Sequence, residues 1–347
     1  MQVSTLGIDL AKNVFQLHGV DNSGKTVLRK RLTRNAFLSF LAQLSPCLIG
    51  MEACASAHHF ARRLMQYGHQ VRLMPPSYVK PYVKRDKTDA RDAEAICEAV
   101  ARPNMRFVAV KSETQQAILA LHTERDLLIR ERVASTNSLR AMLAEFGVVM
   151  ETGLSALYKT LPVILENGEN ALTALTRRSA ARQLAHLREL EHQIAEVERE
   201  LNAWFHSQEA CRRLEKVPGV GMLTATYMVA AVGDGSQFTS SKQFAAWVGL
   251  TPKEHSSGGK QWLGPISKRG DRYFRYLLIH GARALAAVIE RHRDKQTWFY
   301  SLLKRKPFNV AVVAQAGRTA RILWSMLRGG SEYREVAPGE YREVAPV

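Results

Sequence analysis

Short apolar runs alternate with polar, turn-forming residues over the first part of the chain. Runs at 3–9, 14–20 and 26–31 are separated by such residues, and Asn22-Ser23-Gly24 is a hairpin signal between the last two. Their length and composition predict a meander of three strands. Helical and strand patterns then alternate, at about 34–44, 47–51, 57–67, 70–74 and from Thr88 onward. This order predicts an α/β domain over residues 1–110.

Apolar positions at helical spacing dominate residues 111–215. A first run, from Ile118 to Leu143, ends at Gly147. A second run recurs every three or four positions through Leu187, Leu190, Ile194, Val197, Leu201 and Trp204. Because this is a heptad seam, we predict a helical coiled-coil spacer. So short a seam leaves two arrangements open: an antiparallel helix pair within the chain, or a contact between protomers.

Residues 216–330 predict a mainly helical domain that begins at a glycine-rich turn. The turn contains Gly219 and Gly221, whose region could hold a phosphate through free backbone amides, although an ordinary turn between helices explains the same residues. Farther on we predict a helix from Asp271, as its N-cap, to about Ile289. Residues 331–347 repeat Glu-Tyr-Arg-Glu-Val-Ala-Pro with too little apolar content for a core, so we expect a disordered tail.

The net charge changes the picture because it is large and unevenly distributed. The 347 residues include 49 Lys and Arg against 32 Asp and Glu, a net charge of +17. Residues 1–110 carry +8, residues 111–215 carry −2, and residues 216–330 carry +13. Two basic lobes around a near-neutral spacer indicate a nucleic-acid partner. Without an apolar stretch of roughly 20 residues or a signal pattern, we expect a soluble, cytoplasmic protein.

Four carboxylates of the first domain stand where predicted elements end or begin. Asp9 ends a strand, Glu52 follows a buried strand, and Asp89 and Asp92 share one face at a helix start. Oxygen ligands of this kind suit Mg²⁺ or Mn²⁺, and two such ions about 3.5–4 Å apart can stabilise both oxygens of a phosphodiester displacement. Any one carboxylate alone is more often a surface acid or a helix cap. Basic side chains that would tolerate phosphate surround the last pair: Lys84, Arg85, Lys87 and Arg91.

The motifs that carry these residues resemble a known family. They are Gly7-Ile8-Asp9-Leu10-Ala11-Lys12, Met51-Glu52-Ala53-Cys54 with His58-His59, and Lys87-Thr88-Asp89-Ala90-Arg91-Asp92-Ala93. In order and spacing they are similar to the RuvC-like domain, of RNase H fold, in the insertion-sequence 110 family of transposases. The turn at 217–221 and residues 249–284 resemble the C-terminal transposase domain of that family, closest to the insertion-sequence 1111 subgroup.

This resemblance implies a mechanism and its partners. Asp9, Glu52, Asp89 and Asp92 would form the metal-binding DEDD set, and a serine of Ser256-Ser257-Gly258 would attack a DNA phosphate and form a covalent phosphoserine link. The enzyme would recombine donor and target DNA as a dimer or tetramer. A structured bridge RNA would guide it.

The residues around the serine are compatible with that role. A hydroxyl is a weak nucleophile unless a base or metal helps to remove its proton, and Ser257 lies between His255 and Lys260. We favour Ser257 over Ser256 because the two glycines that follow it would let the backbone approach a phosphate. A flexible loop is the plainer interpretation of these residues. Flanking phosphates would meet the basic side chains of Lys253, Lys260, Lys268, Arg269 and Arg272.

Other functions fit parts of the same sequence. Gly-x-Asp before a hairpin also opens actin-like ATPases and sugar kinases, but a second Asp-x-Gly phosphate loop is missing. A basic nucleic-acid-binding protein without catalysis, or an RNase H-fold junction nuclease, would share the charge pattern. The binding protein would show no metal-dependent strand transfer, which separates it from a recombinase.

Overall fold

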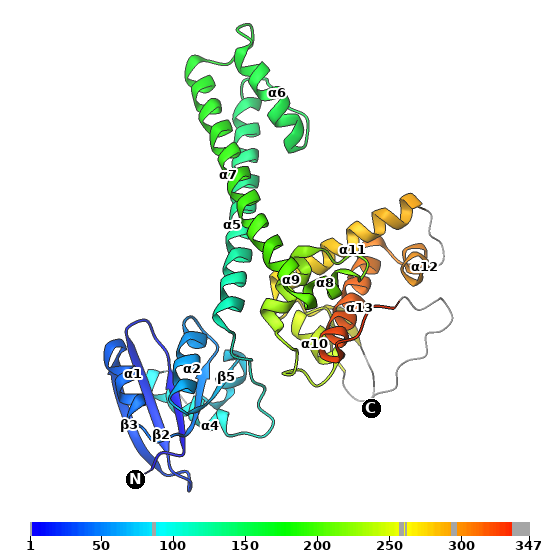
Figure 1. The fold of residues 1–347 in the computed structure, drawn as a ribbon. Helices are drawn as coiled ribbons and strands as arrows, with labels where there is room; N and C mark the ends of the chain where they lie inside the picture. Colours follow the sequence, from blue (N-terminus) through cyan, green and yellow to red (C-terminus); the bar gives the residue numbers. More distant parts are fainter. Residues whose placement is uncertain (1, 85–87, 257–259, 261, 293–296, 335–347) are drawn as a thin grey trace. The chain divides into compact units, whose positions relative to one another are not determined.

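A computed structural model of the chain describes residues 2–84, 88–256, 260, 262–292 and 297–334 (Figure 1). Contacts within the chain define two compact units. The first contains residues 1–116 and 231–243, and the second contains residues 117–230 and 244–347. Of the helices that the structure describes, none has both the length and the hydropathy needed to cross a membrane.

The first unit is built on a five-stranded sheet with helices on both faces. Its elements are β1 (Thr5–Asp9), β2 (Val14–Val20), β3 (Thr26–Thr33), α1 (Arg34–Ala42), β4 (Leu48–Glu52), α2 (Ala57–Gln66), β5 (Gln70–Met74), α3 (Pro76–Val79), the 3₁₀ turn η1 (Lys80–Tyr82) and α4 (Asp89–Val100). The strand order is β3-β2-β1-β4-β5. Strands β1, β4 and β5 are parallel, and β2 is antiparallel to both of its neighbours. This mixed sheet confirms the predicted α/β domain and is RNase H-like, as the family resemblance implied.

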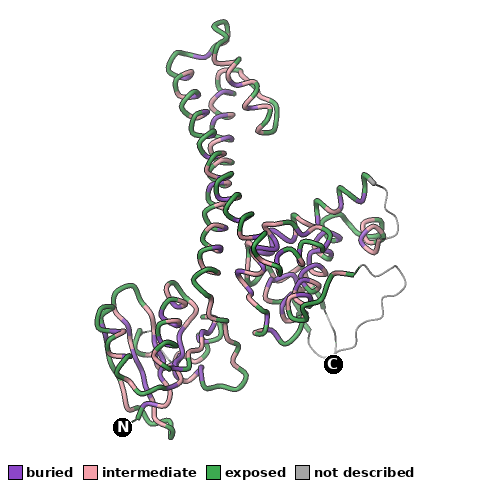
Figure 2. Tube along the Cα trace, viewed as in Figure 1, coloured by how far each residue is buried: buried purple, intermediate pink, exposed green. Residues whose placement is uncertain are grey.

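Side-chain alternation along the strands decides what covers each face of the sheet. On one face Phe15 of β2 packs against Phe37 of α1 and Phe60 of α2, with ring centroids 4.5 and 5.2 Å away. All three rings are buried. The opposite face carries α4, whose buried residues include Ala93 and Cys97. The middle three residues of β1 and of β4 are buried, because both faces of the sheet are covered, and Figure 2 shows the buried stretches within the sheet.

Gly7 sets the distance between β1 and α4. A Cβ atom at this position would lie 2.2 Å from the carbonyl oxygen of Ala93 and 2.3 Å from the amide nitrogen of Cys97. Real Cβ atoms do not come this close to a backbone, so only glycine lets the helix rest directly on the strand. Gly7 therefore positions the start of α4 relative to the end of β1.

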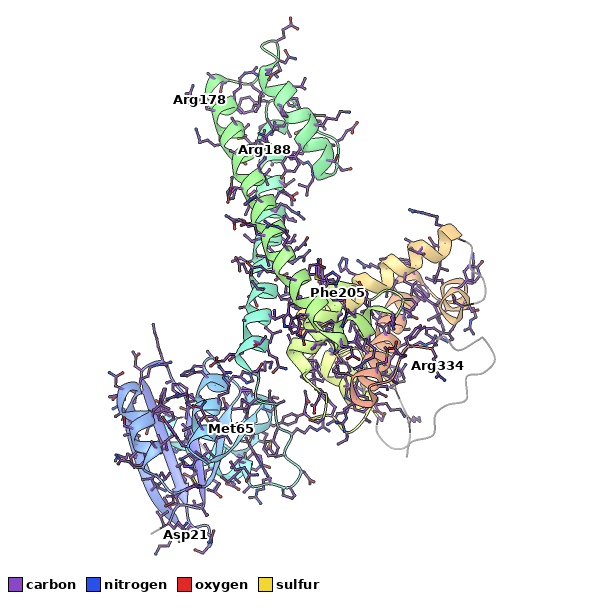
Figure 3. All side chains as sticks on the ribbon, viewed as in Figure 1. Asp21, Met65, Arg178, Arg188, Phe205 and Arg334 are labelled. Carbon is purple, nitrogen blue, oxygen red and sulfur yellow. The ribbon has the colours of Figure 1, made fainter. Side chains whose placement is uncertain are left out.

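The hairpin between β2 and β3 is closed by Asp21, which Figure 3 shows at one end of the sheet. Its Oδ1 accepts hydrogen bonds from the amides of Ser23 at 2.9 Å and Lys25 at 3.0 Å. These bonds satisfy the turn and lower the pKa of Asp21, with the Ser23 hydroxyl as the largest contribution. The turn thereby fixes the register of β3 on β2.

The second unit contains most of the remaining elements and is mainly helical. The elements after α4 are α5 (Glu113–Ala144), α6 (Leu154–Glu166), α7 (Ala174–Ser207), α8 (Glu209–Glu215), α9 (Met222–Val232), α10 (Ser241–Val248), β6 (Pro252–Glu254), β7 (Leu263–Ile266), α11 (Arg272–His292), α12 (Trp298–Arg305) and α13 (Phe308–Gly329). Residues 331–334 follow with no helix or strand, and the rest of the predicted tail lies outside the described residues.

Helices α5 and α7 lie side by side and run antiparallel, and together we call them the arm (Figure 1). Arg125 of α5 pairs with Glu198 of α7 at 2.6 Å, and Arg132 pairs with Glu191 at 2.9 Å. The predicted heptad positions from Leu187 to Leu201 are at most 5% exposed and belong to one core with residues of α5. The seam is therefore buried within the chain, which is the first of the two arrangements left open by the sequence.

Candidate active site and serine hairpin

Three of the four predicted carboxylates meet on the α4 face of the sheet. Asp9, Asp89 and Asp92 each place a carboxylate oxygen within 4.8 Å of the others, and we call them the Asp cluster. Asp9 is the last residue of β1, and the other two lie in the first turn of α4. The close approach that Gly7 permits is what brings these two elements together.

The local backbone helps the cluster to tolerate its negative charge. Thr88 caps α4, with its hydroxyl accepting a hydrogen bond from the amide of Arg91 at 3.4 Å. The N-terminus of a helix carries a partial positive charge that stabilises carboxylates in its first turn. Three carboxylates so close still repel one another, and their oxygens are the ligands that a hard divalent cation prefers. The donor set thus fits a divalent metal ion.

Glu52 lies beside the Asp cluster on the neighbouring strand. Ile8 pairs with Met51 between parallel strands β1 and β4, so the next residues, Asp9 and Glu52, are neighbours on the same face. Both charges also act on Cys54, whose pKa is raised by burial first and then by Glu52 and Asp9. Among the described residues, Glu52 falls outside the group of oxygens that lie within 4.8 Å of one another. Its role as a fourth ligand remains a prediction.

The two histidines of the second motif have different surroundings. Nδ1 of His58 accepts a hydrogen bond from the amide of Lys111 at 3.2 Å. Burial, with the charges of Lys111 and Arg62, lowers the pKa of His58 to about 4. The ring of exposed His59 contacts Phe60. His58 therefore serves as a neutral acceptor that fastens residue 111 to α2.

Of the four basic side chains predicted near the Asp cluster, the structure describes two, Lys84 and Arg91. Lys84 lies 3.1 Å from a Glu98 oxygen and 3.8 Å from one of Glu94, so this cation is shared with two carboxylates of α4. Arg91 is half-buried in the first helical turn. The remaining two predicted residues, Arg85 and Lys87, lie outside the described residues.

In the second unit, β6 and β7 form an antiparallel hairpin that the sequence did not predict; we call residues 252–266 the serine hairpin. The amide of His255 donates to the carbonyl oxygen of Trp262 at 3.0 Å and extends the pairing beyond Glu254 and Leu263. Ser256 donates its hydroxyl to Glu254 Oε1 at 2.8 Å. Lys253 and Lys260 are exposed on this hairpin. Ser257 lies outside the described residues.

Residues 267–271, which we call the basic turn, follow the serine hairpin. Lys268 and Arg269 are exposed, and Lys268 adopts φ = 54°, a value uncommon for a residue other than glycine. A Cβ on Gly270 would lie 1.8 Å from the carbonyl oxygen of Trp247, so the turn packs directly on the end of α10. Arg272, the first residue of α11, is exposed next to it. The predicted phosphate-binding side chains at this place are thus presented from a firmly held backbone.

Arg275 of α11 is hydrogen-bonded to the backbone of the basic turn and to that of the end of α10. It was not among the residues predicted from the sequence. This arginine is 9% exposed, and its Nη1 donates to the carbonyl oxygens of Val248 at 2.7 Å and Arg269 at 3.4 Å. A guanidinium among carbonyl oxygens at a helix C-terminus is electrostatically favoured. The signal that would have found it is a charged residue between the apolar positions Phe274 and Leu277 of a predicted helix.

The glycine-rich turn at 217–221 packs against α11. Gly219 has φ = +83°, and a Cβ on Gly281 of α11 would lie 2.0 Å from the Gly219 carbonyl oxygen. The amide of Val220 donates to Val217 within the turn. A Cβ added at Gly221 would meet no other atom within 4 Å among the described residues. Close packing explains Gly219, and phosphate binding at the turn stays a prediction.

An RNase H-like sheet with clustered aspartates at the end of β1 and the start of α4 is the architecture of a DEDD transposase domain, which makes this protein a DNA-cleaving and recombining enzyme. A sequence profile of that domain matches residues 6–147. A second profile, described as the transposase IS116/IS110/IS902 family, matches residues 211–298. The chain belongs to this family of insertion-sequence transposases.

Named relatives are similar over almost their whole length. A probable family 20 transposase of Pseudomonas aeruginosa is 46% identical over 96% of this chain and 99% of its own. The transposase for IS1328 of Yersinia enterocolitica is 43% identical over 95% of this chain and 98% of its own. The transposase for IS1111A of Coxiella burnetii is 41% identical over 96% of this chain and 92% of its own.

Proposed function

We propose that this transposase is a site-specific DNA recombinase that works through a covalent phosphoserine intermediate and is guided by a structured bridge RNA. The observation that carries the proposal is the pairing of two chemical parts in one chain: the Asp cluster in the first unit and the basic serine hairpin in the second. A junction nuclease needs the first part and has no use for the second.

In this proposal the carboxylates hold the metal. Asp9, Asp89 and Asp92, with Glu52 beside them, would bind Mg²⁺ or Mn²⁺. A divalent ion there supplies electrostatic stabilisation of the phosphate oxygens and lowers the pKa of a bound hydroxyl. Gly7 lets α4 pack directly on β1, and this packing fixes the separation of Asp89 and Asp92 from Asp9.

The hydroxyl of Ser257 acts as the nucleophile. Its oxygen bonds to a DNA phosphorus, the bond from that phosphorus to one strand oxygen breaks, and the serine proton is released as the leaving strand oxygen gains one. Each phosphodiester lost is replaced by a phosphoserine ester, so rejoining requires no ATP. Ser257 is preferred over Ser256 because two glycines directly follow it and would let the backbone approach a phosphate. Lys253, Lys260, Lys268, Arg269 and Arg272 contact the flanking phosphates.

A denaturation-resistant protein–DNA adduct tests the nucleophile. Ser257→Ala should lose the adduct and still bind DNA, whereas Ser256→Ala, the matched control next to it, should retain part of it. Mass spectrometry of the wild-type adduct should locate the DNA on Ser257. An adduct mapped to Ser256 or to a tyrosine would show that the assignment is wrong.

The guide is tested by the RNA that accompanies the protein. Sequencing RNA that co-purifies with the wild-type protein should recover one discrete, structured species. A random sample of cellular RNA would instead mean that the positive charge binds RNA without selection. Sedimentation of the reconstituted complex tests the proposed dimer or tetramer.

A further inference from the structure

A groove of about 420 Å³ lies beside the Asp cluster, between α4 and the β2–β3 side of the sheet. We call it the α4-side groove. Strands β2 and β3 contribute one wall, and the first turns of α4 contribute the other. The side chains that matter for its chemistry are Gln16, His18, Arg29, Arg31, Arg91 and Glu94.

The strand register leads from the Asp cluster into this groove. Asp9 pairs with Gln16 on β2, and Gln16 pairs with Arg31 on β3. Residues paired across neighbouring strands share a face of the sheet, so this row lies on the α4 side together with the cluster. His18 and Arg29 form the next row. Because neighbouring strands are about 4.8 Å apart, Arg31 lies about 10 Å from Asp9 along the row.

The charge of the groove is positive. Arg29 and Arg31 are exposed, and within the described part of the chain neither forms an ion pair. Arg91 adds a third guanidinium from α4. The one acid in the lining, Glu94, lies 3.8 Å from Lys84, which offsets its charge. Burial lowers the pKa of His18, so that ring is a neutral hydrogen-bonding group near pH 7.

We propose that the α4-side groove binds the single DNA strand that is being cut. Its arginines would contact the phosphates next to the one at the Asp cluster. The inference rests on the proposed function, since a strand whose phosphate reaches the cluster must continue along an adjacent path. The distance of about 10 Å from Asp9 to Arg31 places Arg31 within reach of phosphates that neighbour the one at the Asp cluster. The groove supplies two strand arginines and one helix arginine over that path.

The test compares two double variants that change the charge equally. Arg29→Glu with Arg31→Glu alters the groove, and Lys25→Glu with Arg63→Glu alters exposed positions of the same unit outside it. Binding of fluorescein-labelled oligo-dT is measured in EDTA over roughly 50 to 200 mM salt. We expect the groove variant to bind at least about tenfold more weakly and to lose about 1.4 from the salt slope, about 0.7 for each phosphate contact.

A second measurement uses the unaltered protein. Hydrogen exchange of β3 should slow when oligo-dT is added, since this edge strand forms the outer wall of the groove. Equal weakening by both double variants, or β3 exchange that oligo-dT does not change, would overturn the inference. Binding of oligo-U is measured in parallel. If the groove variant lost affinity for oligo-U but not for oligo-dT, the inference would also be overturned, because the occupant would then be RNA. None of these measurements requires strand transfer, so an absent phosphoserine adduct refutes the proposed function separately.

Discussion

Tyr227 of α9 donates its hydroxyl to Asp271 at 2.7 Å, while the other oxygen of that carboxylate accepts the amide of Phe274 at 2.8 Å. Asp271 thus caps α11, as predicted, and its carboxylate also links α9 to the basic turn through the hydrogen bond with Tyr227. Burial, and then Asp271, raises the pKa of Tyr227, which keeps its hydroxyl protonated as the donor. One carboxylate therefore joins three elements of the second unit.

Asp271→Ala should destabilise the second unit by roughly 1–3 kcal/mol, because it removes the cap and leaves the half-buried Tyr227 hydroxyl without its acceptor. Tyr227→Phe should cost about 1 kcal/mol, since it keeps the cap. Denaturant unfolding of both variants measures the difference. Equal losses would mean that the cap contributes nothing beyond the tyrosine bond.

Asp9→Asn and Asp92→Asn should each reduce recombination by at least about 10²-fold while DNA binding persists, because the site loses an ionised metal ligand. In EDTA these variants should be slightly more stable than wild type, since like charges no longer repel. With Mn²⁺ present, only wild type should gain thermal stability. Glu124→Gln, at an exposed position of α5, is the control and should change neither result.

The buried His122 predicts a loss of stability in acid. Its Nε2 lies 3.0 Å from the hydroxyl of Thr226, and its Nδ1 lies 3.3 Å from that of Tyr273. Burial, with the charge of Arg125, lowers the pKa of His122 to about 3 from 6.5. Between these values the unfolded chain binds the proton and the folded chain does not. The contribution of His122 to stability is therefore fully present above pH 6.5 and falls by about 1.4 kcal/mol per pH unit below it.

Replacing His122 by Gln should reduce the acid slope by about 1.4 kcal/mol per pH unit, as measured by urea unfolding at several pH values, while the contribution of His58 remains. The exposed His192 offers a matched control on α7. His192→Gln should keep the wild-type slope. A wild-type slope that survives in His122→Gln would assign the acid sensitivity to other groups.

Ile194→Asp should unfold the arm rather than separate protomers, because the side chain is buried against the same chain. A buried, unpaired carboxylate costs roughly 3 kcal/mol or more. Circular dichroism should report lost helicity, whereas Ala195→Asp, at an exposed position of the same helix, should leave it intact. A lower assembled mass with full helicity would contradict this and place the seam between protomers.

Gly7→Ala should disturb the Asp cluster without touching a carboxylate. The methyl group would push α4 away from β1, at a cost of about 1–3 kcal/mol or more for overpacking. Mn²⁺ affinity by calorimetry should fall with recombination. Gly168→Ala, which has open space around it, serves as the control. Unaltered metal affinity in Gly7→Ala would show that α4 can shift without cost to the site.

The first unit was predictable almost element by element because its strands are short apolar runs bounded by turn residues. The serine hairpin was not, since Pro252–Glu254 is polar and exposed and Leu263–Ile266 contains glycine and proline. The contact between Gly7 and α4 gives no local signal either. Likewise, the surroundings of His122 come from residues about 100 and 150 positions away, which no periodicity connects.

The Asp cluster shows the same division between local and long-range information. The spacing of Asp89 and Asp92 at a helix start was readable from sequence, and so was the strand that ends at Asp9. Their meeting on one face depends on the register of β1 and on the packing of α4. For Arg275 the function lies in which carbonyl oxygens it reaches, and those belong to two separate segments.

Because α5 and α7 are antiparallel, the length of the arm can change without a change in the rest of the fold. One heptad added to α5 and one added to α7 would lengthen each helix by about 10.5 Å and return every apolar side chain to the seam. The pairs at Arg125 with Glu198 would stay in register at one end while residues 145–173 moved outward as a block. Insertions and deletions of whole heptads in both helices can therefore change the length of the arm in steps of about 10.5 Å. Such changes alter neither the Asp cluster nor the serine hairpin.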